Sequence, residues 1–312
     1  MDRVGHRGRR ADREVKRRIG AFKPLLFAAA LIVPATAFAA EPRTAGPVGA
    51  ASGPEREQVW WVPMTPPRSD AVLHLMTTVY RPPGDGPFPL AIVNHGSPRD
   101  AADRRKQERN PMRGPSRWFV AQGFAVAVPM RRGYGASEGA FSEGYGRCDA
   151  ADFYAGGRAS AADIGAVLTY FRSQAFVDPN RIVLVGQSAG GWGVLAAATR
   201  SPEGVVAVVN FAGGRGSLAP DQNCSATRLI EMAGVFGRSA RIPSLWIYTE
   251  NDRYIGPALS IPMAAAYRDS GGRVEFNLLP PFGSDGHALF ARAVERWGPL
   301  VQPFLAAAGL IR

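Results

Sequence analysis

Short runs of apolar residues alternate with segments of helical periodicity along most of the chain. Eight of these runs are rich in Val, Ile, Leu or aromatic residues and are bounded by Gly, Pro or charged residues, which is typical of β-strands. Several show no polar alternation, which favours strands buried on both faces of a sheet. The eight expected strands are EQVWWVPM, AVLHLMTTVYRP, FPLAIVNHG, GFAVAVPM, RIVLVG, VVAVVNFAG, PSLWIYTEND and RVEFNLLP, and the first two are expected to form a hairpin.

Helices are expected between these strands. Apolar residues recur at helical spacing from Ile164 to Phe171, and a Ser-Pro pair at Ser201 ends an alanine-rich run. Alternation of strands and helices predicts an α/β fold with a mostly parallel central sheet of about eight strands and helices on both faces. The other expected helices cover residues 116–122, 189–199, 257–269 and 288–307.

The first forty residues have the pattern of a secretory signal peptide. A basic segment ending at Lys23 precedes the apolar run PLLFAAALIVPATAFAA, which closes in small residues at Ala37, Ala39 and Ala40. The apolar run is short for a transmembrane helix, although an uncleaved membrane anchor is the alternative. We therefore expect a signal peptide over 1–40 and a periplasmic or secreted protein without stable membrane insertion after cleavage.

The remaining chain is expected to form one catalytic domain. Residues 41–56, rich in Pro, Gly and Ala, are predicted to be a flexible lead-in, and residues 57–312 the domain itself. The net charge of the chain is +11, and the first forty residues account for +6 of it. The domain itself is therefore only mildly basic. Because no basic–aromatic surface pattern accompanies that charge, nucleic acid is not an expected partner.

A possible nucleophile lies between the fifth expected strand and the helix after it. Gly186-Gln187-Ser188-Ala189-Gly190 is a G-x-S-x-G sequence. In a strand–turn–helix context this pentapeptide predicts an elbow that projects a serine hydroxyl above the sheet, and its glycines avoid clashes in the tight turn. The alternative is a plain Gly-rich loop.

Activation of Ser188 requires a base and a group that orients it. His287 is the only histidine after Ser188, and it lies in a loop after the last expected strand. Asp252, at the end of PSLWIYTEND, is the expected orienting acid, with Glu250 as second choice. Asp285 is expected to form a turn instead. The order Ser–Asp–His is that of the α/β-hydrolases.

The expected oxyanion donors are the backbone N–H groups of Ala189 and Ser97. Gly96, before Ser97, allows a close backbone approach. His95, Tyr134 and Gln187 are candidate substrate-pocket residues.

These motifs together resemble the α/β-hydrolase superfamily, and in particular its dienelactone hydrolase and prolyl-oligopeptidase-like branch. The stretches that carry the resemblance are NHG at 94–96, RRGYGASEG at 131–139, VDPNRIVLVGQSAGG at 177–191, and Asp252 with His287. They span nearly the whole domain. Dienelactone hydrolases carry cysteine at the elbow, where this chain has Ser188. The oligopeptidases carry a β-propeller, and no such domain is expected before the first strand here.

The surroundings of the expected site give further predictions. About 40 residues separate VVAVVNFAG from Asp252, too few for a large cap domain, so an open site is expected. The segment 97–116 holds six basic and three acidic residues between Arg99 and Arg113, and is either a solvated flap or an attractor of anionic substrates. Trp192 is expected to pack under the elbow.

The chain has two cysteines, Cys148 and Cys224. In an exported protein this even number predicts one disulfide, here between loops on the rim of the site. Two cysteines and four histidines at these spacings form no metal-binding pattern, and no cofactor is expected.

The predicted function is hydrolysis of a small carboxylic ester through a Ser188–His287–Asp252 triad and an acyl-enzyme. One alternative is a serine aminopeptidase or acyl-peptide hydrolase with the same triad. Another is a catalytically inactive hydrolase fold that serves as a binding protein. The sequence gives neither the acyl or alcohol specificity nor the oligomeric state.

Overall fold

The computed structural model describes residues 43–311, so the predicted signal peptide lies outside the described residues. The core is a nine-stranded sheet with the order β1-β2-β3-β5-β4-β6-β7-β10-β11. Its strands are β1 (Gly46–Ser52), β2 (Glu57–Met64), β3 (Leu73–Tyr80), β4 (Phe88–Asn94), β5 (Ala125–Pro129), β6 (Val177–Gln187), β7 (Val205–Phe211), β10 (Ser244–Thr249) and β11 (Val274–Leu279). A separate two-stranded ribbon pairs β8 (Ser217–Ala219) with β9 (Gln222–Asn223).

The sheet is mostly parallel, as expected. From β5 to β11 every neighbouring pair of strands is parallel, whereas β1, β2 and β3 are antiparallel to their neighbours. All eight expected strands are present, and the first two form the expected hairpin.

The ninth strand, β1, corrects one expectation. It lies inside the segment 41–56 that was predicted to be a flexible lead-in, and it pairs with the edge of β2. Most of its residues are exposed, so backbone pairing rather than apolar burial holds it, and the strand leaves no apolar pattern in the sequence.

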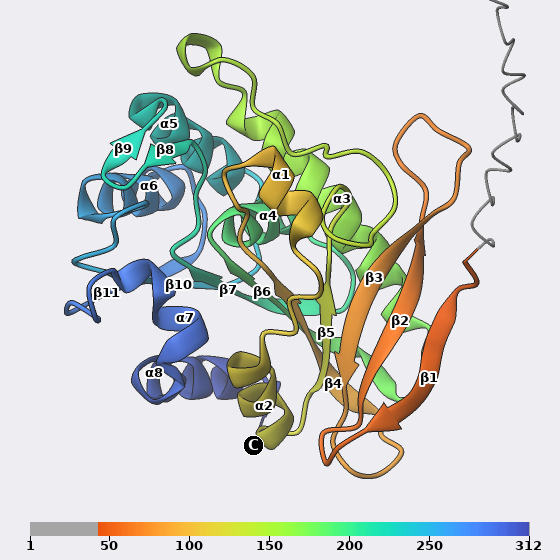
Figure 1. Cartoon of the computed structure of the whole chain (residues 1–312). Helices are drawn as coiled ribbons and strands as arrows, with labels where there is room; N and C mark the ends of the chain where they lie inside the picture. The colour runs from red at the N-terminus through yellow and green to blue at the C-terminus, as the bar shows by residue number, and fades with distance from the viewer. Residues whose placement is uncertain (1–42, 312) are drawn as a thin grey trace, which may run out of the picture. The chain divides into compact units, whose positions relative to one another are not determined.

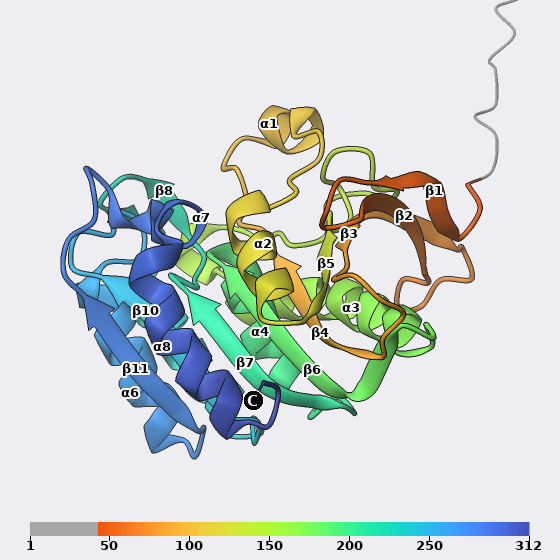
Figure 2. The same cartoon turned by 90° about the horizontal axis from the view of Figure 1, so that it is seen from below.

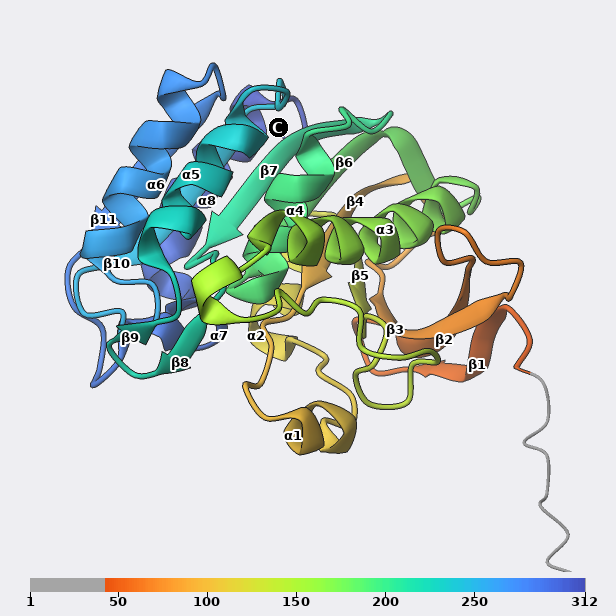
Figure 3. The same cartoon turned by 90° about the horizontal axis from the view of Figure 1, so that it is seen from above.

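Helices cover both faces of the sheet (Figures 1, 2 and 3). One apolar core lies under α3, α4, α5 and α6, seen in front of the sheet in Figure 3. The other lies under α2 and α8, seen in front in Figure 2. The helices are α1 (Ala101–Lys106), α2 (Arg113–Ala121), α3 (Phe153–Arg172), α4 (Ala189–Ala198), α5 (Ala226–Gly237), α6 (Pro257–Asp269), α7 (Leu289–Arg292) and α8 (Val294–Ala307).

The expected helix over 288–307 is divided in two. Ala293 leaves the helical conformation between α7 and α8, with φ −137° and ψ 55°. Between β7 and β10 the chain forms only the β8–β9 ribbon and α5. Within residues 43–311, none of the helices has the length and apolar character that crossing a bilayer requires.

Candidate active site

The candidate nucleophile Ser188 lies at the junction of β6 and α4. Its backbone has φ 54° and ψ −121°, a left-handed conformation that a residue with a side chain rarely adopts. Its N–H donates to the carbonyl of Phe211 on β7, and its own carbonyl accepts from Trp192. Trp192 is fully buried below this turn, as expected. The turn is thus the strained elbow that the G-x-S-x-G sequence predicts.

The glycines of the elbow are required by close backbone approaches. A Cβ at Gly190 would collide with the backbone of Asn94 and His95 at the end of β4. A Cβ at Gly96 would lie 3.2 Å from the Ser188 Cβ. The elbow therefore packs directly against the turn that follows β4.

The structure brings His287 and Asp252 together. The imidazole Nδ1 lies 2.9 and 3.0 Å from the two Asp252 carboxylate oxygens. That carboxylate is buried and also accepts from the backbone N–H groups of Tyr254 and Ile255, each at 2.8 Å. Because Nδ1 faces Asp252, Nε2 is the nitrogen left to accept a proton.

The other two acidic candidates lie elsewhere. Glu250 follows the last residue of β10 and its side chain is exposed. Asp285 accepts from the backbone N–H of His287 at 3.0 Å and from that of Arg253 at 3.2 Å. It therefore makes the turn expected of it and fixes the backbone of the histidine loop.

Ser188, Ala189, Ser97 and His287 all line one cleft of about 1460 Å³. No acceptor among residues 43–311 is hydrogen-bonded to the backbone N–H of Ser97 or of Ala189. Free amides beside a serine hydroxyl are the donors that an oxyanion would need. Within the same residues, no group of three or more His, Cys, Asp or Glu side chains is arranged to hold a metal ion.

Known proteins share the sequence pattern and the fold of this chain. The sequence model of the X-Pro dipeptidyl-peptidase (S15 family) matches residues 70–225, half of the chain. The chain belongs to the S15 family. The matched residues include Ser188 and the turn after β4 but end before Asp252 and His287. A search of curated proteins gives no match.

Solved structures similar to this S15 protein include esterases and peptidases. An acetyl xylan esterase from Paenibacillus sp. R4 is 15% identical with a TM-score of 0.59, and the match covers 85% of this chain and 88% of that one. A Klebsiella pneumoniae protein described as a dienelactone hydrolase is 17% identical with a TM-score of 0.52, over 80% of this chain and 98% of that one.

A puromycin-hydrolysing peptidase from Mycobacterium tuberculosis is also similar, at 17% identity and a TM-score of 0.53. That match covers 78% of this chain but only 39% of the peptidase. At these identities the likenesses concern the fold. They agree with the expected α/β-hydrolase architecture, and the family match makes this chain a member of a family of hydrolases.

The expected pocket residues do not line the cleft. His95 and Tyr134 are completely buried, and their rings are in edge-to-face contact. His95 hydrogen-bonds through Nδ1 to the Gly96 carbonyl at 2.6 Å, and its Nε2 accepts from the Arg131 N–H. Burial and the nearby Arg131 lower the pKa of His95 to about 3, so the ring is neutral. Gln187 instead donates to the His287 carbonyl at 2.8 Å.

Sequence reasoning missed a buried charged cluster, Arg131–Glu143–Arg215, beside the cleft. All three side chains are at least nine-tenths buried, and Glu143 and Arg215 line the cleft. The signal in the sequence is weak, because the three residues come from separate loops after β5 and β7. The one local signal is a carboxylate in the middle of the Gly-rich segment GAFSEGYG.

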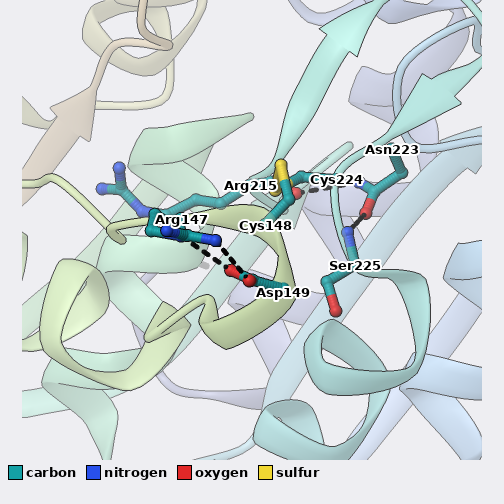
Figure 4. The surroundings of a disulfide bond; sticks show 7 residues. All are labelled: Arg147, Cys148, Asp149, Arg215, Asn223, Cys224 and Ser225. Carbon is teal, nitrogen blue, oxygen red and sulfur yellow. Dashed lines mark hydrogen bonds and ion pairs between the residues drawn. A yellow bond between two sulfur atoms is a disulfide. The ribbon is translucent and has the colours of Figure 1, made fainter.

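The expected disulfide between Cys148 and Cys224 is present, with a Cα–Cα distance of 5.0 Å. Figure 4 shows that it joins the loop after β5 to the segment after β9. Cys148 lines the cleft, and Arg147 and Asp149 on either side of it form an exposed ion pair at 2.7 Å. The disulfide therefore holds part of the rim together.

The charged segment 97–116 forms another part of the rim. Arg99 donates to the carbonyl of Leu218 at 3.0 Å, and its guanidinium lies 5.7 Å from the centre of the Tyr254 ring. Arg104 lies over the ring of Phe141 at 4.0 Å. Since Asp100 and Asp103 also line the cleft, the rim carries both signs of charge rather than a purely cationic face.

Proposed function

We propose that this S15 protein is an exported serine esterase that cleaves small carboxylic esters. The observation that carries the proposal is the strained backbone of Ser188 in a cleft that also contains His287, whose Nδ1 is held by Asp252. A serine hydroxyl is a poor nucleophile unless a positioned base removes its proton. The proposal of export is supported by the disulfide, which forms in oxidising compartments.

In the proposed reaction, Nε2 of His287 takes the proton of the Ser188 hydroxyl as its oxygen attacks the ester carbonyl carbon. The tetrahedral oxyanion accepts hydrogen bonds from the amides of Ser97 and Ala189. Collapse of the intermediate breaks the bond to the alkoxy oxygen, which receives the proton from His287. A water molecule, deprotonated by His287, then releases the acid from Ser188.

Peptide-bond cleavage by the same three residues is the second candidate. The family match favours it, because the family is described as X-Pro dipeptidyl-peptidase. The carboxylates of Asp100 and Asp103 line the cleft and would face the ammonium group of a peptide N-terminus.

Turnover of short p-nitrophenyl esters, measured beside aminoacyl and X-Pro p-nitroanilides, tests both candidates. We expect ester turnover that the Ser188→Ala variant abolishes, and weak or absent anilide turnover. Ser173→Ala, at the C-terminal end of α3, is the matched control and is expected to retain full activity. Faster turnover of anilides than of esters would select the peptidase. Absence of turnover on every substrate would favour the binding protein.

A further inference from the structure

Glu143 is a buried carboxylate at the side of the cleft that the proposed reaction does not use. It has no exposed surface, and it receives hydrogen bonds from three side chains. Arg131 contacts it through Nε, Arg215 donates at 2.8 Å, and the Tyr134 hydroxyl donates at 3.0 Å. Burial alone would raise the pKa of Glu143, but the guanidiniums of Arg131 and Arg215 outweigh burial and hold that pKa well below its usual range. The side chain is therefore an anion that bridges two cations.

The first of these cations holds the turn after β4. Nη1 of Arg131 donates to the carbonyl of His95 at 2.8 Å, and the Arg131 N–H donates to the His95 ring at 3.4 Å. The imidazole in turn hydrogen-bonds to the Gly96 carbonyl. The peptide that bears the proposed Ser97 donor follows Gly96 directly. Its position thus depends on Arg131.

The second cation reaches the nucleophile elbow. Nη2 of Arg215 donates to the Ser160 hydroxyl at 2.6 Å and lies 3.5 Å from the Ala189 carbonyl. The Arg215 carbonyl accepts from Asn223 at 3.0 Å, next to the disulfide, as Figure 4 shows. Arg215 is therefore fixed from the rim while it contacts the start of α4.

We propose that Glu143 is a positioning residue that sets the relative placement of the Ser97 and Ala189 amides. This inference rests on the proposed esterase function. Oxyanion donors act only when they are already aimed at the position that the oxyanion will occupy. Without the negative charge of Glu143, two buried guanidiniums would face each other uncompensated. Arg131 and Arg215 would then shift, and each would carry its part of the oxyanion site with it.

A purely stabilising role for Glu143 gives a different outcome. Loss of stability alone lowers the number of folded molecules and leaves the rate constant of each folded site unchanged. If the oxyanion donors are misplaced, kcat at each folded site falls while KM stays nearly unchanged. The binding of inhibitors that form a tetrahedral adduct becomes weaker as well.

The test compares Glu143→Gln with wild type and with the matched control Glu203→Gln, a glutamate paired with Arg172 on the surface. Sites are counted by end-point titration with a fluorophosphonate, and the probe of the oxyanion site is phenylboronic acid. We expect Glu143→Gln to lower kcat per titrated site by about 10- to 100-fold. KM should change less than about twofold, and inhibition by phenylboronic acid should weaken by a similar factor to kcat. Glu203→Gln should match wild type in all three values.

Arg215→Lys is measured in parallel, because it keeps the charge but loses the planar fork of donors. If Glu143→Gln fails to fold, the kcat per titrated site of Arg215→Lys tests the inference in its place. Wild-type kcat per titrated site in the folded variant, or a change confined to KM, would overturn the inference. If wild type itself is neither titrated nor active, the proposed function fails instead, so the two failures are distinguishable.

Discussion

The floor and the rim of the cleft are built by different means. The floor consists of the elbow at Ser188 and the His287 loop, and it is held by backbone hydrogen bonds, close glycine contacts and apolar packing. The rim consists of residues 97–106, the loop around Cys148 and the segment around Arg215. It is held by arginine contacts and a disulfide. The floor thus provides the proposed nucleophile and base, whereas the rim provides the proposed Ser97 donor and bounds the space that a substrate would enter.

The largest effect is expected on the floor, from Asp252→Asn. The amide can still approach Nδ1 of His287, but it cannot stabilise the imidazolium and it favours the wrong tautomer. We expect kcat on p-nitrophenyl esters to fall by about 10³- to 10⁴-fold with little change in thermal stability. Glu250→Gln, two residues away and exposed, is the control and should behave as wild type. Equal losses in both variants would remove Asp252 from the triad.

The rim is expected to show its largest effect when the disulfide is removed. The bond closes a separation of 76 residues, for which chain entropy gives a stabilisation of about 4 kcal/mol. Cys148→Ala with Cys224→Ala should therefore lower Tm by about 10 °C in a calorimetric scan. KM should rise more than kcat falls, because the disulfide joins the loops that bound the cleft directly and reaches the elbow only indirectly, through Asn223 and Arg215. A loss of kcat alone would contradict this division between floor and rim.

The neutral ring of His95 gives a pH-dependent prediction for the boundary between floor and rim. Its pKa is lowered to about 3 in the folded protein. Between that pH and about 6.5, the imidazole of the unfolded chain binds a proton and that of the folded protein does not. Above about pH 6.5 the ring is neutral in both states, and the contribution of His95 to the free energy of unfolding is fully present. This contribution is lost as the pH falls toward 3.

Urea unfolding of wild type and His95→Asn at pH 7 and pH 4.5 measures this contribution. The asparagine amide can replace the Nδ1 donor to Gly96 and does not titrate. As the pH is lowered, we expect the free energy of unfolding of wild type to fall more steeply than that of His95→Asn, by at most about 1.4 kcal/mol per pH unit. Identical pH slopes would mean that His95 is charged in the folded protein.

The smallest effect is expected from Arg99→Ala. Its side chain links the flap to Leu218 across the rim but contacts no residue of the floor that acts on substrate. We expect KM to change by about twofold at constant kcat, the equivalent of less than about 1 kcal/mol. Arg105→Ala, on the same short helix, is the control. A tenfold rise in KM for an anionic ester, absent for a neutral one, would instead support attraction of anionic substrates.

The floor was also the part that the sequence predicted best. Ser188 and Asp252 follow the ends of β6 and β10 closely, and His287 lies in the loop after β11. These strands have strong apolar patterns, so the positions of the three residues follow from the order of the strands. The β1 strand escaped prediction because it is exposed and Gly-rich. Glu143 and Arg215 escaped because nothing in the spacing of two loops reveals an ion pair between them. His95 and Tyr134 pack beneath the cleft, which proximity in sequence to Gly96 and Gly133 does not indicate.

Labelling of the protein with a fluorophosphonate, followed by peptide mapping, shows whether Ser188 is an activated nucleophile. We expect a single adduct on Ser188 that is lost in the His287→Ala variant while that variant remains folded by circular dichroism. No adduct on folded wild-type protein, or an adduct on another serine, would mean that Ser188 is not the nucleophile.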